Sequence, residues 1–163
     1  METEEFIEQQ VAEYAEEKRR AGHWTAGEAI ARARNSIQSL IGPDPSKRGH
    51  RFFKGIEPGG RRIGWIWIGP PPEVFAVEGG QWLYQITVEP SMRGKGFGRG
   101  MLDALEYQLV QEGFKSLQLN VFKWNVVARN LYESMGYEVV LDTATEAGMR
   151  KRLDGLLRPD HDG

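Results

Sequence analysis

Cysteine is absent from this chain of 163 residues, and its absence excludes several kinds of site at once. Without cysteine there is no disulfide framework, no thiol nucleophile and no cysteine-ligated metal. Histidine is scarce as well, and the three that are present, His23, His50 and His161, lack the spacing of a metal site. We therefore expect no bound metal and assign these histidines to surface or packing positions.

Long apolar runs and a strong excess of one charge are also missing. Residues 1–5 are acidic and no long apolar stretch follows them, so we expect neither a signal peptide nor a membrane-spanning helix. The cytoplasm is then the default location. The 21 Lys and Arg against 23 Asp and Glu give a net charge of −2, which argues against a protein that binds nucleic acid by neutralising its phosphates.

What the chain does have is the composition of an ordinary globular protein, with 40% hydrophobic and 27% charged residues. Its length fits one domain, which we place at residues 1–157, followed by a polar tail at 158–163. Hydrophobic periodicity then predicts the secondary structure. Helices are expected at 3–20, 25–41, 98–112 and 126–135, and strands at 51–56, 62–68, 82–88, 116–121, 137–141 and 148–153. This order predicts an α/β fold with a mixed sheet and helices packed on it, not a regular βαβ repeat.

Two of these elements carry specific predictions. Thr25 and Glu28 have the spacing of a capping box at the start of the second helix. The strand at 62–68 is apolar on both faces, which is typical of a strand that is covered on both sides. Its Trp65 and Trp67 can fill the core or a homodimer interface, and we favour the core. The apolar residues of the second helix recur at helical period: Ile30, Ala33, Ile37, Leu40 and Ile41.

A basic, glycine-alternating loop between the strand at 82–88 and the following helix is the most informative segment. It combines the unpaired amides and positive dipole end of a helix N-terminus with three basic side chains, which favours a bound anion. Its four glycines can adopt conformations that other residues resist, and they let a phosphate approach the main chain. We predict a site for a phosphate-bearing ligand; the alternative is a glycine-rich turn with solvated charges. The loop reads Arg93-Gly94-Lys95-Gly96-Phe97-Gly98-Arg99-Gly100.

Two common phosphate-binding motifs do not fit this loop. A Rossmann fingerprint that starts at Gly94 needs glycine where Arg99 stands, and a P-loop needs Ser or Thr where Gly96 stands. The loop instead has the pattern Arg-x-x-Gly-x-Gly, from Arg93 to Gly98. It follows a strand that ends in Ile86-Thr87-Val88-x-Pro90. About thirty residues downstream a second motif follows, Asn125-x-x-Ala128-x-x-Leu131-Tyr132-Glu133-x-x-Gly136-Tyr137.

With both motifs in this order, the sequence resembles the GNAT acetyltransferase superfamily over about residues 50–153. The segment Ala147–Leu153 is similar to the last strand of that family. The resemblance implies a mostly antiparallel central sheet that contains one splayed pair of parallel strands and is flanked by helices. It also implies that acetyl-CoA binds, as a co-substrate, where those two strands separate.

The resemblance assigns roles to the residues of both motifs. The pyrophosphate of acetyl-CoA would lie on the loop, and main chain at Ile86 and Val88 would pair with the pantetheine arm and polarise the thioester carbonyl. Asn125 matches a position that contacts the cofactor, but it is also a good helix N-cap, and both roles stay open. The loop residues assigned to the cofactor are Arg93, Gly94, Lys95, Gly96, Phe97, Gly98 and Arg99.

Tyr132 matches the general acid of this family. A phenol within hydrogen-bond reach can protonate the sulfur of the departing thiolate. The alternative is a packed tyrosine beside Leu131 and Met135, with no part in the chemistry.

No general base can be assigned. A lysine-like amine has a pKa of about 10.4 and is almost wholly protonated at pH 7, so some group must accept its proton. The resemblance places a carboxylate in one of two strands, but Asn120 and Gln85 stand at the corresponding positions. Glu78 and Glu89 are nearby in sequence and are interpreted as solvated turn residues.

We therefore expect an N-acetyltransferase that passes the acetyl group from acetyl-CoA directly to a primary amine, since no cysteine can carry it. The acceptor is a small molecule or a peptide, and the resemblance implies that it is selected near His23 and Trp24 and at the loop from Asp142 to Glu146. The Asp142 and Glu146 carboxylates would suit a cationic amine; the alternative is that they only make the loop soluble. Three alternatives stay open: an acyl-CoA sensor without catalysis, an acyltransferase with another donor or acceptor, and a different nucleotide-binding protein.

Overall fold

The computed structural model describes residues 2–156, and the tail at 158–163, with His161, lies outside them. The chain divides after Phe52 into two compact units, a helical one and one built on a sheet. No helix among residues 2–156 combines the length and the apolar character needed to cross a bilayer.

The first unit consists of two helices, α1 (Glu2–Arg20) and α2 (Ala29–Ile41), followed by a 3-10 turn at Pro45–Arg48. An ion pair between Arg34 of α2 and Glu8 of α1 joins the two helices. The buried apolar residues of this pair are Phe6, Val11 and Ala15 in α1, and Ala29, Ala33, Ile37 and Ile41 in α2.

The start of α2 differs from the prediction. Half of the capping box is present, because the Glu28 carboxylate accepts a hydrogen bond from the Thr25 amide at 3.0 Å. However, residues 26–28 form a turn and the helix begins only at Ala29. Its buried residues repeat every four positions, a narrow stripe that leaves Ile30 (49% exposed) and Leu40 (37% exposed) on the flanks.

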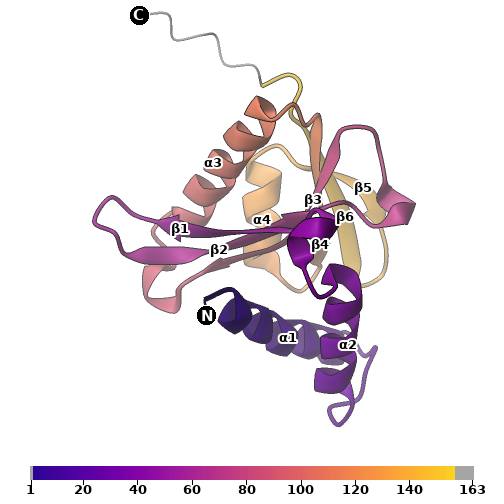
Figure 1. Ribbon diagram of the computed structural model, residues 1–163. Coiled ribbons are helices and arrows are strands. Elements are labelled where there is room, and N and C mark those ends of the chain that lie inside the picture. The colour runs from indigo at the N-terminus through magenta and orange to yellow at the C-terminus, as the bar shows by residue number, and fades with distance from the viewer. Residues whose placement is uncertain (1, 157–163) are drawn as a thin grey trace, which may run out of the picture. The chain divides into compact units, whose positions relative to one another are not determined.

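The second unit is a mixed sheet with strand order β1-β2-β3-β4-β6-β5 and two helices, α3 and α4 (Figure 1). Strands β2 and β3, β4 and β6, and β5 and β6 pair antiparallel, whereas β3 and β4 are parallel. The predicted fold class is confirmed. The bounds are β1 (Arg51–Ile56), β2 (Arg62–Gly69), β3 (Gly80–Val88), α3 (Phe97–Gln111), β4 (Ser116–Phe122), α4 (Val126–Ser134), β5 (Glu138–Asp142) and β6 (Glu146–Arg152).

One face of this sheet forms the core with α3 and α4. Alternate residues of the central strands, such as Leu119 of β4 and Met149 of β6, belong to the same buried cluster as Leu102 and Leu109 of α3. Trp65 and Trp67 of β2 are not part of this cluster and alternate with Ile66 and Ile68, which are. They are 6% and 5% exposed, so the interpretation of these residues as core is confirmed. The core therefore holds β3, β4 and the two helices in a fixed arrangement, which positions the residues described next.

Candidate active site

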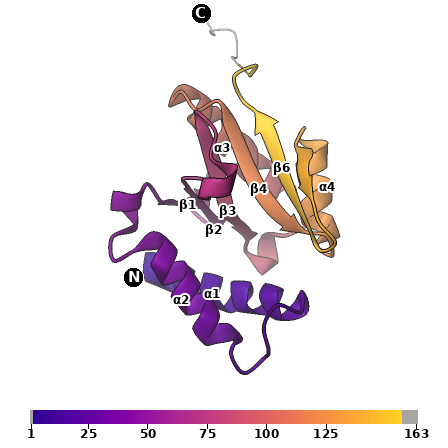
Figure 2. The same cartoon turned by 90° about the vertical axis from the view of Figure 1, so that its right-hand side faces the viewer.

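Strands β3 and β4 are paired only at their beginnings. The register joins Gly80–Leu83 to Ser116–Leu119, and beyond these residues the two strands are no longer partners (Figure 2). From there β3 stays paired with β2, and β4 stays paired with β6. The splayed parallel pair is confirmed, and on the β4 side no strand in the described part of the sheet pairs with Ile86–Val88.

A β-bulge lies where the strands separate. Ile68 of β2 pairs with Leu83 and Trp67 pairs with Gln85, so Tyr84 is an extra residue in β3. Such a bulge bends the strand and redirects its side chains. The Tyr84 hydroxyl donates a hydrogen bond to the Pro70 carbonyl at 2.6 Å, and its ring stacks on Trp67 with centroids 4.7 Å apart. Burial raises the pKa of Tyr84 to about 12, so this side chain stays protonated and anchors the bulge.

The glycine loop runs from a 3-10 turn at Pro90–Met92 to the start of α3 at Phe97. Gly94 and Gly96 have φ of +74° and +83°, which only glycine adopts without strain. A Cβ atom at either position would meet no atom within 4 Å, so backbone conformation and not crowding requires glycine there. Gly98 and Gly100 lie within α3 without positive φ, so the prediction of special conformations was wrong for these two.

Most main-chain amides of this loop have no acceptor among residues 2–156. The first hydrogen bond of α3 runs from the Gly100 amide to the Gly96 carbonyl at 3.1 Å. Before it, the amides of residues 96–99 have no intrahelical acceptor. No oxygen in residues 2–156 accepts a hydrogen bond from the main-chain amides of residues 94–99. The loop therefore offers free donors at the positive end of a helix dipole, which suits a bound phosphate.

Two of the three basic side chains of the loop also bind the protein itself. Arg93 Nε donates to the Val88 carbonyl at 3.0 Å and ties the loop to the end of β3. Arg99 donates to Ser134 Oγ and links α3 to α4, while Lys95 is exposed. The two arginines therefore shape the loop in addition to giving it positive charge.

Asn125 precedes α4 and acts as its N-cap. The side-chain oxygen accepts a hydrogen bond from the Ala128 amide at 3.4 Å. The capping role is therefore confirmed, and the cofactor contact stays a prediction.

Tyr132 is 7% exposed and belongs to the core cluster, so it is a packed side chain whatever its chemical role. Its ring meets the ring of Tyr137 edge-on, with centroids 5.8 Å apart. The Tyr137 hydroxyl donates to Glu106 at 2.9 Å, and Lys151 Nζ donates to the same carboxylate at 2.6 Å. Burial raises the pKa of Tyr137, and the nearby Glu106 charge raises it further.

Sequence reasoning missed Glu106, which is 3% exposed in the middle of α3. The signal was present, because Glu106 lies four residues after Leu102 and three before Leu109, on the apolar face of the helix. A buried carboxylate needs a partner, and here Lys151 and Tyr137 provide it.

The two carboxylates nearest the site in sequence, Glu78 and Glu89, have different surroundings. Glu78 is exposed and pairs with Lys115 at 3.5 Å, which agrees with a solvated turn residue. Glu89 is half-buried and pairs with Arg62 at 2.8 Å, so the same interpretation was wrong for Glu89.

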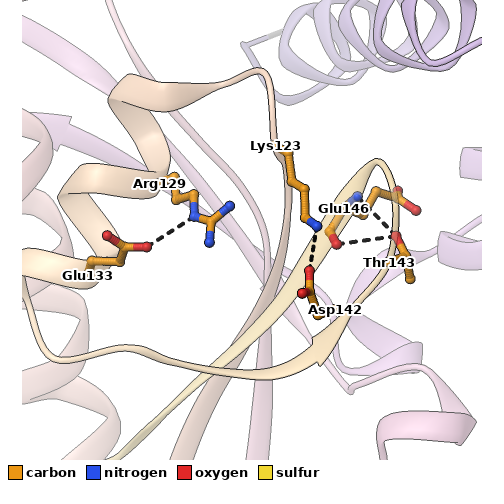
Figure 3. A network of polar contacts seen from close by, with 6 residues as sticks. All are labelled: Lys123, Arg129, Glu133, Asp142, Thr143 and Glu146. Carbon is orange, nitrogen blue, oxygen red and sulfur yellow. Dashed lines mark hydrogen bonds and ion pairs between the residues drawn. The ribbon is translucent and has the colours of Figure 1, made fainter.

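The expected loop from Asp142 to Glu146 is shorter than predicted, because Asp142 ends β5 and Glu146 begins β6. Asp142 pairs with Lys123 at 2.5 Å, as Figure 3 shows. Glu146 accepts a hydrogen bond from the side-chain amide of Asn120 at 3.1 Å. A carboxylate from another strand therefore lies beside the position where the sequence has only Asn120.

The turn between α1 and α2 has contacts within its own unit. The Trp24 ring packs edge-on against Tyr14 with centroids 5.5 Å apart, and Lys18 Nζ lies within 6 Å of both ring centres, at 5.6 and 5.9 Å. A ring nitrogen of His23 lies 3.4 Å from Lys18 Nζ. The selection of an acceptor by this turn stays a prediction.

Comparison with known proteins gives consistent matches. The sequence profile of the Acetyltransferase (GNAT) family matches residues 12–137. Two proteins of Bacillus subtilis (strain 168), each named an uncharacterized N-acetyltransferase, are similar over 157 residues. YycN is 31% identical, with 94% of this chain and 96% of YycN covered. YdgE is 29% identical, with 93% and 92% covered.

Solved structures agree with this result. The crystal structure of YycN superposes with a TM-score of 0.76 at 29% identity, over 88% of this chain and 94% of YycN. The PaiA N-acetyltransferase of Thermoplasma acidophilum, solved in complex with coenzyme A, gives a TM-score of 0.62 over 91% of this chain and 93% of PaiA. At 18% identity, that second likeness concerns the fold alone.

Proposed function

The chain belongs to the Acetyltransferase (GNAT) family, and from this premise we propose that it transfers the acetyl group of acetyl-CoA to a primary amine. The observation that carries the proposal is the row of unused amides at residues 94–99, directly after the strand that separates from β4. A phosphate group and an extended pantetheine chain would each find complementary donors and acceptors there. The coenzyme A bound to PaiA, a protein of the same fold, supports this choice of ligand.

The diphosphate of acetyl-CoA would accept hydrogen bonds from the loop amides, with Lys95 and the free N–H groups of Arg93 and Arg99 adding positive charge. The pantetheine arm would run along Ile86–Val88 and pair with β3 in place of a strand, since β4 has left that edge. The Val88 carbonyl already accepts from Arg93, so the arm would use the other main-chain groups of this segment first. The thioester would then approach the bulge at Tyr84.

Transfer would proceed by direct attack of the amine on the thioester carbonyl. Breaking the C–S bond releases a thiolate, and the Tyr132 hydroxyl would protonate it. The Tyr132 ring packs edge-on against the Tyr137 ring, and this contact helps to fix the position of the Tyr132 side chain.

The proposal is tested by measuring thermal unfolding with acetyl-CoA, ATP and NAD in parallel, and by following release of free CoA thiol with a panel of primary amines. A ligand at about 100 times its Kd adds about 2.7 kcal/mol to stability. We expect stabilisation by acetyl-CoA alone and amine-dependent thiol release. Stabilisation by ATP or NAD but not by acetyl-CoA would overturn the proposal.

A further inference from the structure

Glu146 and Asn120 form a polar pair across two strands. Glu146 Oε1 accepts a hydrogen bond from Asn120 Nδ2 at 3.1 Å. In the register of β4 and β6, Asn120 lies opposite Gly148 and Phe122 lies opposite Glu146. The two side chains are therefore diagonal neighbours on one face of the sheet, close enough for their polar ends to meet.

That face is opposite to the one covered by α3 and α4. Leu119 and Val121 of β4 belong to the core cluster, and so do Ala147 and Met149 of β6. Because side chains alternate along a strand, Asn120 and Glu146 point to the other side. Asn120 directly follows Leu119, the last residue of β4 that pairs with β3, so the pair lies where the parallel strands separate.

No Lys, Arg or His within residues 2–156 forms an ion pair with Glu146. Lys123, just after β4, pairs with Asp142 of β5, and Figure 3 shows the Glu146 carboxylate extending away from this ion pair. Arg129 of α4 pairs with Glu133. Arg150 shares the face of Glu146 but lies four residues along β6, which separates their Cα atoms by about 13 Å.

The position of Glu146 is also well defined. Its amide donates to Thr143 Oγ1 at 3.0 Å, and its carbonyl accepts from the Thr143 amide at 3.0 Å. Asn120 orients one carboxylate oxygen, and no donor within residues 2–156 contacts the other one. A half-buried carboxylate with one oriented and one open oxygen suits an incoming ammonium group.

We propose that Glu146, oriented by Asn120, binds the ammonium group of the acceptor and removes its proton. This inference rests on the proposed function and deepens it, because it names the acceptor class: an alkylamine, which is protonated in neutral solution. Two residues that look unsuited to catalysis when read separately, a strand asparagine and a glutamate after a turn, together form the base that the sequence lacks at Asn120 and Gln85.

The proton balance of the transfer is complete with this residue. The ammonium gives one proton to Glu146, and the freed lone pair on nitrogen attacks the thioester carbonyl carbon. The tetrahedral intermediate then loses the second nitrogen proton to solvent as its C–S bond breaks. The thiolate takes a proton from Tyr132, and the Tyr132 phenolate recovers one from solvent. The products are an N-alkylacetamide and CoA thiol, with the Glu146 proton released to water.

The test compares Glu146→Gln with a matched control, Glu138→Gln, which removes an exposed carboxylate at the start of the neighbouring strand β5. The acceptors are putrescine, which is protonated at neutral pH, and aniline, which is neutral. We expect Glu146→Gln to lower kcat/KM for putrescine by about 100-fold or more, and for aniline by much less. The acidic limb of the pH profile of kcat/KM should flatten in this variant. Glu138→Gln should stay near the wild type with both acceptors.

A second variant moves the carboxylate instead of removing it. Asn120→Asp in the Glu146→Gln background exchanges the two partners of one hydrogen bond and should recover a large part of the putrescine activity. A merely structural role for Glu146 predicts no such recovery and equal losses for both acceptors. Either of these two results would overturn the inference.

Binding is measured in parallel, so that failure of the inference is separate from failure of the proposed function. In calorimetry with CoA present, putrescine should bind the wild type at least about tenfold more tightly than Glu146→Gln, while acetyl-CoA binds both equally. If the wild type turns over putrescine and Glu146→Gln has the same kinetics, the inference is overturned but the proposed function is not. Absence of both turnover and putrescine binding in the wild type would overturn the inference, and absence of acetyl-CoA binding would overturn the proposed function as well.

Discussion

The ring of Tyr132 meets the ring of Tyr137 edge-on, and the Tyr137 hydroxyl in turn donates to the buried carboxylate of Glu106. One residue of α4 is thus held by a chain of contacts that reaches α3 and ends at Lys151 of β6. These contacts distinguish the roles of the two neighbouring tyrosines. Tyr137 has its hydrogen-bond acceptor inside the protein, whereas Tyr132 is proposed to act on a substrate.

Tyr132→Phe is the variant that separates an enzyme from a sensor. We expect kcat to fall by about 100-fold or more, because the thiolate loses its proton donor, while the Kd for acetyl-CoA stays within about twofold. Steady-state kinetics and calorimetry check both values. Tyr137→Phe is the matched control and should lower stability more than turnover, by about 1 kcal/mol for its lost hydrogen bond. Unchanged turnover in Tyr132→Phe would favour the sensor.

Lys151→Met tests the buried ion pair of α3 and β6. Removing the lysine leaves Glu106, 3% exposed, with its charge compensated only by Tyr137, so we expect a loss of about 3 kcal/mol in the free energy of unfolding. Adding Glu106→Gln removes the buried carboxylate charge that lost its lysine partner, and it keeps an acceptor for Tyr137. The double variant should therefore be more stable than Lys151→Met alone. Urea unfolding measures all three proteins, and equal stability of the single and double variants would contradict the prediction.

Stability should decline in alkali through Tyr84. Its pKa is raised by burial to about 12, above a value of about 10 in the unfolded chain, so the fold favours the protonated phenol. This contribution is complete below about pH 10 and is lost as the pH rises toward 12. Tyr84→Phe lacks the hydrogen bond to Pro70 and should be less stable than the wild type at about pH 9. The difference should narrow toward pH 12, and a constant difference across this range would count against the assignment.

Gly96→Ala and Gly100→Ala form a matched pair in the glycine loop. Neither added Cβ meets an atom within 4 Å, but only Gly96 has a positive φ. We expect Gly96→Ala to lower stability by about 1–2 kcal/mol. We also expect it to weaken acetyl-CoA binding by about tenfold or more, since about 1.4 kcal/mol of lost interaction with the reoriented amides is enough for that. Gly100→Ala should raise helix stability by up to about 1 kcal/mol and leave affinity unchanged. Equal behaviour of the two variants would show that the conformation at Gly96 is not important.

The helices and strands were predictable because their signals are local. Apolar periodicity and glycine stops located α3, β4 and α4 to within a residue or so at each end. The start of α2 could not be predicted, because the Thr25–Glu28 spacing also fits a turn that precedes a helix. Glycine spacing indicated the phosphate loop, but φ at Gly94 and Gly96 came only from the structure.

The candidate base could not be found from the sequence for a different reason. Asn120 and Glu146 are 26 positions apart, and their contact depends on the register between β4 and β6. Shifting that register by one residue would place Glu146 on the opposite face of the sheet. The burial of Glu106 depends in the same way on Lys151, which is 45 positions away in the chain.

The hydrogen bond from Arg93 to the Val88 carbonyl has a consequence for the kinetics of ligand binding. The loop is fastened to β3 by its own side chain, so it has its shape before any ligand arrives. The conformational entropy of ordering it is then lost during folding and not during association. Replacing Arg93 would therefore slow the capture of acetyl-CoA as well as weaken its retention, whereas removal of the Lys95 charge alone would act mainly through long-range attraction and would be masked by salt.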